Sequence, residues 1–345
     1  MIVKDEEDVI GRCLDCVKDI VDEMIIVDTG SKDNTEKIVS QYTDKVYHFL
    51  WEDDFSKARN FSFSKATRDY ILWLDADDVI DEENIIKLKT LKKNLDSSID
   101  VVMMKYQIGD QFVFYRERLL KREKGFIWSN AVHETINIDG YIDYQDITIF
   151  HKKEKVNDSF RNIKIYKKLL KNGKKLNARE TFYYARELYE YQYYEEAIKY
   201  FCRFLKNKNA WIENKIEACL NLSQCYYQRN EKDKAYKILI KSFIYDLPRS
   251  EILCELGYLC FLNGEYKKAI YWYQLALKNK IDIKKGGFIR KDCYDFIPYV
   301  QLCICYYQLN DLKTALYYHE KAGQVNPSHP IYQYNCQYFN QMTKK

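Results

Sequence analysis

Short apolar runs alternate with helical patterns over the first 151 residues of the chain. The runs are rich in Ile and Val and apolar on both faces, which is typical of strands in a buried parallel sheet. Between them, apolar residues recur at the three- and four-residue spacing of one helix face. We therefore predict strands at 1–3, 23–27, 46–49, 70–74 and 101–106, with helices at 7–20, 33–41, 55–66 and 82–95.

This alternation predicts right-handed parallel crossovers, and hence an α/β domain of Rossmann-like type with a mainly parallel sheet. In such sheets ligands bind beyond the carboxyl ends of the strands. Two predicted strands end in acidic segments, Asp28-Thr29-Gly30-Ser31 and Asp75-Ala76-Asp77-Asp78. Because the three carboxylates of the second segment repel one another, we expect positive or polar partners beside them.

From about residue 157 the strand pattern disappears and four helical segments align with one another. Each follows another helical segment and carries an alanine at the same place, at intervals of 38, 34 and 46 residues: Ala197, Ala235, Ala269 and Ala315. The pattern resembles tetratricopeptide repeats, whose unit is about 34 residues. The last interval holds an insertion at 282–293, and segment 331–341 is expected to cap the all-α solenoid.

The composition of the chain limits the possible classes of function but does not identify the activity. Lys and Arg number 55 against 51 Asp and Glu, so charge gives no indication of nucleic acid binding. No apolar run approaches the roughly 20 residues of a transmembrane helix, and no targeting signal is apparent, so we expect a cytoplasmic protein. The eleven cysteines fit reduced thiols, and we interpret Cys13 and Cys16 as core residues of a helix rather than a zinc or redox site.

The segments VDTGSKDNT and LDADD, whose first aspartates are 47 residues apart, enclose DDFSKARNFSFSKATRDYILWL. Together they resemble family 2 glycosyltransferases, over roughly residues 1–151, and imply their nucleotide-sugar-binding GT-A fold. With the helical repeats, the chain is similar to bacterial peptide S-glycosyltransferases of the sublancin-synthase type. We place the catalytic domain at 1–155, a linking helix at 156–178, and the repeats with their capping helix at 179–345.

The resemblance implies a donor site for a UDP-sugar and a Mg²⁺ or Mn²⁺ ion, which neutralises the charge of the departing diphosphate. The metal ligands it implies are Asp75, Asp77 and His151. The nucleotide-sugar contacts it implies are Glu6, Asp28, Arg59 and Asp75. Three alternatives stay open: helix capping for Asp28, a surface salt bridge for Arg59, and a buried hydrogen-bonded histidine for His151.

The stretch FIWSNAVHETI resembles the part of these enzymes that presents a carboxylate to the acceptor. An inverting transfer needs a base for the acceptor proton, and we favour Glu134, with His133 as second candidate. Neighbouring residues of a strand face opposite ways, so both can face the sugar only if this segment is a loop. We expect Trp128 either in the wall of the site or in the core. Arg118 and Arg122 are candidates for the diphosphate, although YRERLLKREK is more typical of a solvated face.

These features predict an inverting, metal-dependent glycosyltransferase acting on a peptide or protein acceptor that lies in the groove of the repeats. A lipopolysaccharide-core or polysaccharide acceptor is the runner-up, and a non-catalytic scaffold with a decayed transferase domain is a third reading. The motif Asp75-x-Asp77 also fits a haloacid-dehalogenase-type phosphatase. We reject it because that motif belongs on the first strand of its domain, and here other predicted strands precede it.

Overall fold

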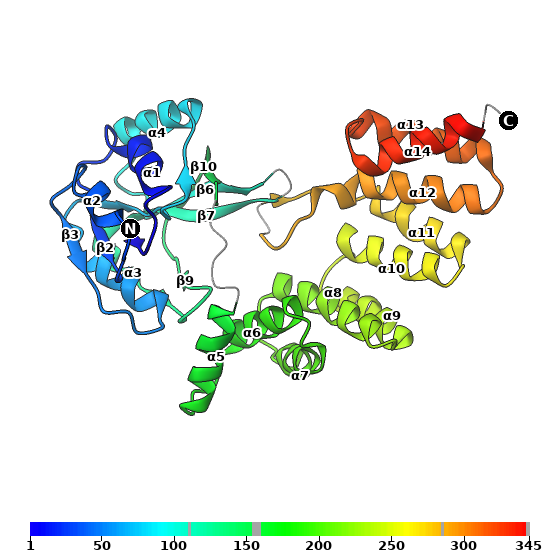
Figure 1. Ribbon diagram of the computed structural model, residues 1–345, viewed down its shortest axis with the longest axis horizontal. Coiled ribbons are helices and arrows are strands. Elements are labelled where there is room, and N and C mark those ends of the chain that lie inside the picture. Colours follow the sequence, from blue (N-terminus) through cyan, green and yellow to red (C-terminus); the bar gives the residue numbers. More distant parts are fainter. Residues whose placement is uncertain (110–111, 154–159, 284–285, 343–345) are drawn as a thin grey trace. The chain divides into compact units, whose positions relative to one another are not determined.

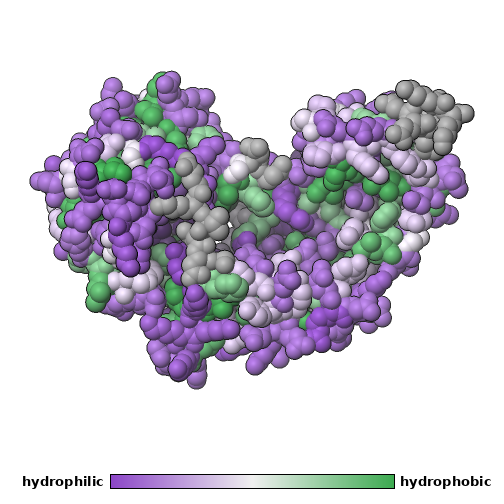
Figure 2. Space-filling view, viewed as in Figure 1, coloured by the Kyte–Doolittle hydropathy of each residue, from purple (hydrophilic) through white to green (hydrophobic). Residues whose placement is uncertain are grey.

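The computed structural model describes residues 1–109, 112–153, 160–283 and 286–342. The chain divides into two compact units, Met1–Glu180 and Thr181–Lys345 (Figure 1). Hydrophilic residues cover much of the face shown in Figure 2. Among the described helices, none has the length and apolar character needed to cross a membrane.

The first unit begins with a small parallel sheet in the order β1-β2-β3. Its strands are Ile2–Val3, Ile26–Asp28 and Val46–His48, and the helices α1 (Ile10–Val17) and α2 (Thr35–Val39) connect them. Apolar residues of these elements pack together as one core, which includes Val3, Ile10, Leu14, Ile26 and Val39. Since Val3 lies opposite Asp28 in the register, the loops after β1 and β2 leave the same edge of the sheet.

A second sheet has five strands in the order β4-β7-β6-β10-β5. They span Tyr70–Leu72 (β4), Asp78–Val79 (β5), Val101–Ile108 (β6), Phe112–Lys121 (β7) and Ile142–His151 (β10). Only β6 and β10 pair in parallel, whereas β7 runs antiparallel to both β4 and β6, and β5 antiparallel to β10. The sheet is therefore mixed rather than mainly parallel, because β7, which we had not predicted as a strand, lies between two strands that run the same way.

The first unit also contains three helices, one 3₁₀ helix and a separate pair of short strands. They are α3 (Phe55–Ser64), α4 (Glu82–Asn94), the short 3₁₀ helix η1 (Arg122–Lys124), the strand pair β8 (Trp128–Ser129) and β9 (Thr135–Ile136), and α5 (Arg161–Lys171). The aspartate before each of the helices α3 and α4 caps it, since Asp54 accepts from Lys57 N and Asp81 accepts from Asn84 N. These caps fix where both helices begin, close to their predicted starts.

The second unit consists of helices, and from α7 to α14 each helix contacts the next one along the chain. The helices are α6 (Ala178–Glu190), α7 (Tyr194–Leu205), α8 (Ile212–Gln228), α9 (Lys232–Lys241), α10 (Ser250–Leu262), α11 (Tyr266–Ala276), α12 (Phe296–Gln308), α13 (Leu312–Val325) and α14 (Pro330–Met342), with 3₁₀ turns η2 (Ser242–Ile244) and η4 (Lys291–Tyr294). The four aligned alanines lie on α7, α9, α11 and α13 and are fully buried. Their small size lets paired helices approach closely, so the predicted class, an α/β domain followed by helical repeats, is confirmed.

One buried carboxylate fastens loops of the first unit together. Glu23 accepts hydrogen bonds from Lys45 Nζ (2.7 Å), from Thr67 N (2.6 Å) and from Arg68 N (3.2 Å). Burial alone would raise the pKa of Glu23, but these donors outweigh it and lower the pKa to about 2 from the ordinary 4.5. Glu23 therefore contributes stability that is present above pH 4.5 and is lost as the pH falls towards 2.

Replacing Glu23 with glutamine is expected to cost about 2–3 kcal/mol of unfolding free energy at pH 7. The difference from the wild type should shrink steadily between pH 4.5 and pH 2, as measured by urea unfolding of the first unit. As a control, Glu52→Gln removes an exposed ion pair with Lys57 and should change stability by less than about 0.5 kcal/mol. An E23Q deficit that is independent of pH would contradict this account.

Candidate functional site

Each of the three clustered carboxylates has a different cationic partner. These partners compensate the repulsion between the carboxylates that the sequence led us to expect. The pairs are Asp75 with Arg59 (2.7 Å), Asp77 with His151 (3.3 Å) and Asp78 with Arg118 (2.9 Å). The partners come from α3, β10 and β7, which are remote from one another in the sequence. The acidic segment after β4 is thus the meeting point of several elements.

Arg59 connects two of the predicted site residues. Its Nη2 donates to Asp75 Oδ1 at 2.7 Å and its Nε donates to Glu134 Oε1 at 2.6 Å. The guanidinium lies over the rings of Trp128 (4.8 Å) and Trp73 (5.2 Å), and its side chain is only 11% exposed. Burial alone would lower the pKa of Arg59, but the two carboxylates outweigh it and raise the pKa. The ion pair is therefore a buried link rather than a surface salt bridge.

The segment that carries Glu134 is fixed to α3. Asn60 Nδ2 donates to Trp128 O at 2.9 Å, and Trp128 N donates to Asn60 Oδ1 at 2.8 Å. Phe55 N, at the start of the same helix, donates to Ala131 O at 2.8 Å. Trp128 is buried, as predicted. Since Arg59 and Asn60 are neighbours on α3, one helix positions both the guanidinium and the strand pair beside it.

His133 and Glu134 lie in the loop between β8 and β9, and β9 begins only at Thr135. His133 has a φ of 52°, in the left-handed region, so the chain turns sharply there. The strand alternation that would send these side chains to opposite faces does not apply in such a loop. Glu134 meets Arg59, and Arg179 Nε donates to the carbonyl oxygen of His133 at 3.0 Å.

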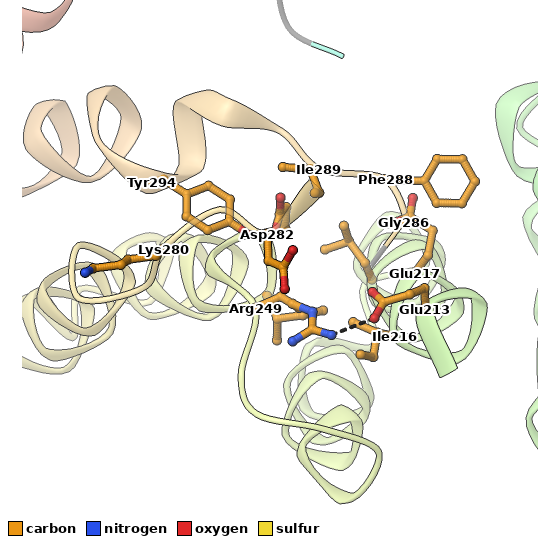
Figure 3. Close-up of a pocket in the computed structure, with 13 residues that line it drawn as sticks. Glu213, Ile216, Glu217, Arg249, Lys280, Asp282, Gly286, Phe288, Ile289 and Tyr294 are labelled. Carbon is orange, nitrogen blue, oxygen red and sulfur yellow. Dashed lines mark hydrogen bonds and ion pairs between the residues drawn. The ribbon is translucent and has the colours of Figure 1, made fainter. Parts of the chain in front are cut away.

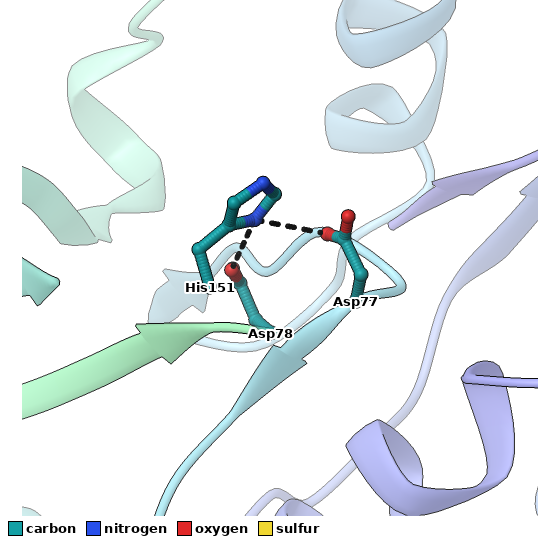
Figure 4. A group of neighbouring side chains, drawn as sticks. All are labelled: Asp77, Asp78 and His151. Atoms are coloured by element: carbon teal, nitrogen blue, oxygen red, sulfur yellow. Dashed lines mark ion pairs between the residues drawn. The ribbon is translucent and has the colours of Figure 1, made fainter. Parts of the chain in front are cut away.

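Asp77, Asp78 and His151 form the one group among the described residues whose donor atoms lie close enough to share a metal ion, all within 4.8 Å (Figure 4). Hydrogen bonds that the His151 ring donates to the carboxylates of Asp77 and Asp78 raise the pKa of His151 to about 9. The Tyr106 hydroxyl also lies 2.9 Å from His151 Nδ1. Asp77 and His151 are 21% and 23% exposed, whereas Asp78 is fully buried, so solvent reaches the first two.

This group differs in one member from the predicted metal ligands. The sequence suggested Asp75, Asp77 and His151, but Asp75 lies against Arg59 and Asp78 takes its place in the group. Burial alone would raise the pKa of Asp75, but the charges of Arg59 and Arg118 outweigh it and lower the pKa. Two carboxylates and an imidazole nevertheless fit a divalent cation, whose remaining ligands would come from phosphate and water.

Asp28 ends β2 in an unusually constrained setting. Its Oδ1 accepts hydrogen bonds from Gly30 N at 2.7 Å and Ser31 N at 2.8 Å. Its Oδ2 is buried and has no hydrogen-bond partner among the described residues. Helix capping does not explain Asp28, because α2 begins only at Thr35, after Asn34. A buried acceptor without a partner is costly, so this oxygen suits a donor supplied by a ligand.

Glu6 lies in the loop after β1, whose neighbour is the loop after β2. Its N–H donates to Thr35 Oγ1 at 2.7 Å, and its carbonyl oxygen accepts from Ile10 N at 3.0 Å, at the start of α1. Asp5 N likewise donates to Ser31 Oγ at 2.9 Å. Glu6 and Asp28 are therefore held at one edge of the parallel sheet by the same pair of loops.

Arg118 corrects the expectation of a solvated face. It is fully buried in β7, where its guanidinium packs on Trp73 (4.0 Å) and Tyr106 (4.4 Å). Arg122 follows β7 and is exposed, as expected. Sequence reasoning missed the roles of Arg118, Asp78 and Arg116, which also lies over Trp73 at 4.6 Å. The signal was present, because three adjacent carboxylates require cations, and β7 supplies two arginines at alternate positions.

The helical unit has a pocket of its own, a cavity of about 80 Å³ between α8, α10 and the segment before α12 (Figure 3). Its charged lining is Glu213, Glu217, Glu251, Asp282, Arg249 and Lys280. Arg249 Nη2 donates to Glu213 Oε1 at 2.6 Å, while burial raises the pKa of Glu217 to about 7. No sequence motif pointed to this pocket.

Comparison with known proteins supports the resemblance of the first unit to family 2 glycosyltransferases. Residues 1–169 match the family model Glycosyl transferase family 2. A TPR repeat-containing protein of Synechococcus elongatus is 39% identical over 142 residues, which cover 40% of this chain and 34% of that protein. The SPbeta prophage-derived glycosyltransferase SunS of Bacillus subtilis is 28% identical over 247 residues, or 67% of this chain and 58% of SunS.

The chain therefore spans about a third of the length of the Synechococcus protein and somewhat over half of the length of SunS. The similarity to SunS exceeds the 180 residues of the first unit, so it extends into the helices. A solved structure of MamA protein matches with a TM-score of 0.38 at 21% identity, over 48% of this chain and 82% of MamA. Residues 1–169 thus match the model of glycosyl transferase family 2, which the sequence motifs resemble, and a unit of helices follows this domain in the chain.

Proposed function

We propose that the chain is an inverting, metal-dependent glycosyltransferase that transfers a sugar from a nucleotide-diphosphate donor, a UDP-sugar, to a peptide or protein acceptor. One observation carries the proposal. Within the region that matches family 2, Arg59 joins Asp75 to Glu134, and His151 of β10 pairs with Asp77, two residues after Asp75. A candidate base and candidate donor ligands are thereby held around one acidic segment.

On the donor side, Asp28 and Glu6 receive the nucleotide and Asp75 the ribose. Oδ2 of Asp28, for which the described residues supply no hydrogen-bond partner, supports this role, because a base N–H would satisfy it. Asp77 and His151, with Asp75 or Asp78, would hold Mg²⁺ or Mn²⁺. The cation would act as a Lewis acid on the departing diphosphate.

On the acceptor side, Glu134 takes the proton as the acceptor atom attacks the anomeric carbon, and the bond to the diphosphate breaks. Arg59 holds the Glu134 carboxylate from one side, which leaves its second oxygen for the acceptor. His133, on the same loop, is the alternative base. Arg59 thereby sets the distance between the donor carboxylate Asp75 and the base.

A peptide acceptor is favoured by the helical unit, because stacked helix pairs present an extended concave surface to a partner chain. The similarity to the glycosyltransferase SunS reaches into these helices, which supports a role of the helices alongside the catalytic domain. A polysaccharide acceptor is the alternative. Intact-mass spectrometry after incubation with UDP-hexoses and Mn²⁺ would separate the two. Mass gain on peptides supports the proposal, whereas gain on glycans alone would replace its acceptor.

Donor binding is expected to show as a thermal shift. At about a hundred times its dissociation constant, the correct nucleoside diphosphate with Mn²⁺ should stabilise the first unit by about 2.7 kcal/mol. Uridine diphosphate should act more strongly than the other nucleotides, and a chelator should remove the effect. Differential scanning fluorimetry on the full chain measures this. If no nucleotide shifts the transition with metal present, the chain is better described as a scaffold.

A further inference from the structure

A β-bulge interrupts the pairing of β6 with β7 beside the acidic segment. Val102 pairs with Leu119, but the next residue, Met103, pairs with Glu117, so Arg118 has no partner on β6. Bulges often turn a side chain towards an active site. On its other side β7 still supports β4, because Trp73 N donates to Arg118 O at 3.2 Å. The extra residue is therefore an arginine, placed where the chain leaves β4 for the acidic segment.

The guanidinium of Arg118 contacts the acidic segment and the residue Trp73 shortly before it. Its Nη1 donates to Asp78 Oδ2 at 2.9 Å and to Trp73 O at 3.2 Å. Its Nε and Nη2 have no hydrogen-bond partner among the described residues, and the flanking rings of Trp73 and Tyr106 cover the group. Because Arg118 is fully buried, we expect it to act through its neighbours rather than by direct contact with the donor or the cation.

Asp78 links Arg118 to Asp75 and to His151. The same Oδ2 that meets Arg118 also accepts from Asp75 N at 3.0 Å, and Asp78 N donates to Asp75 O at 3.1 Å. These two bonds close the turn from Asp75 to Asp78, with Asp77 inside it. Asp78 is also opposite His151 in the pairing of β5 with β10. One buried carboxylate thus relates Asp75, Asp77 and His151 to one another.

We propose that Arg118 is a positioning residue, which acts through Asp78 to hold Asp75 and Asp77 in the geometry that binds the cation and the donor. Stability alone does not account for the pair, since apolar residues of similar size often serve a core equally well. The Arg118–Asp78 pair fixes the backbone conformation between Asp75 and Asp77, whose carboxylates would otherwise repel each other. The consequence for cation and donor binding rests on the proposed function. The consequence for the turn does not.

The test uses Arg118→Lys in the full chain. Lysine keeps a positive charge beside Asp78, but it lacks the planar fork that meets Asp78 and Trp73 O together. We expect hydrogen–deuterium exchange to become faster in peptides covering residues 73–80 and to stay unchanged in β6. Mn²⁺ affinity, measured by electron paramagnetic resonance, should fall by about 10–100-fold, the usual cost of losing an outer-shell partner.

Two further variants keep the test decisive. If the lysine variant does not fold, Arg118→Met combined with Asp78→Asn removes both buried charges and takes its place. Glu23→Gln is the matched control, because it loosens another clamped loop of the same unit and should leave exchange in 73–80 unchanged. Unchanged exchange in 73–80, or equal acceleration in β6, overturns the positioning role. Wild-type protein that binds no Mn²⁺ would refute the proposed metal site, and exchange would still decide the role of Arg118.

Discussion

Asp77→Asn is expected to abolish metal-dependent nucleotide binding and to lower the transfer rate by roughly a thousandfold or more, since the cation supplies several kcal/mol of charge stabilisation. The change removes the carboxylate that faces His151 at 3.3 Å and is open to solvent. Asparagine has nearly the same shape, and Asp77 O still accepts from Lys152 N at 2.9 Å, so the fold should persist. Calorimetry with the nucleotide and Mn²⁺, followed by a transfer assay, measures both effects.

The matched control for this variant is Asp146→Asn. Asp146 precedes His151 on β10, but it is 70% exposed and pairs with Lys87 and Lys105 at the surface. Its replacement should leave binding and transfer at wild-type levels. If the D77N variant keeps Mn²⁺-dependent turnover, Asp77 is not a metal ligand. If it binds the nucleotide equally well with and without metal while transfer is lost, the cation serves the leaving group alone.

Strand ends and their aspartates were predictable, because they depend on local pattern. Asp28 and Asp75 each follow an apolar run that forms a strand, and a strand end is where an α/β sheet binds its ligands. Similarly, Asp54 and Asp81 mark helix starts through their own backbone bonds. Such features need only a few neighbouring residues, so one sequence is enough to find them.

The partners of these aspartates were not predictable to the same degree. Arg59 meets Glu134 across 75 positions of sequence, and only the packing of α3 on β8 creates that contact. Arg118 was mistaken for a surface residue because a strand with four charged residues in ten looks solvated. Its burial depends on a bulge and on Asp78, a member of a two-residue strand. The order of strands in a mixed sheet decides these contacts, and it leaves no local pattern.

Glu134→Gln is expected to lower kcat by roughly 10²–10⁴-fold, the usual contribution of a positioned base, while donor affinity stays nearly unchanged. Glutamine retains an oxygen that can accept from Arg59 Nε, so the link from α3 to the loop should survive the change. Arg59 also keeps its bond to Asp75, which leaves the donor side in place. Single-turnover transfer with saturating donor, together with calorimetry of donor binding, separates the loss of the base from a loss of binding.

Glu117→Gln is the control that matches this variant in burial, because the Glu117 side chain is 14% exposed against 13% for Glu134, and it also pairs with an arginine, Arg116. A loss confined to E134Q means that the position of the carboxylate matters, and not merely its charge within the unit. If E134Q transfers at the wild-type rate and His133→Asn does not, the base is the neighbouring histidine. Because both residues lie in one loop beside α3, that outcome would move the acceptor within the same site and leave the donor side as described.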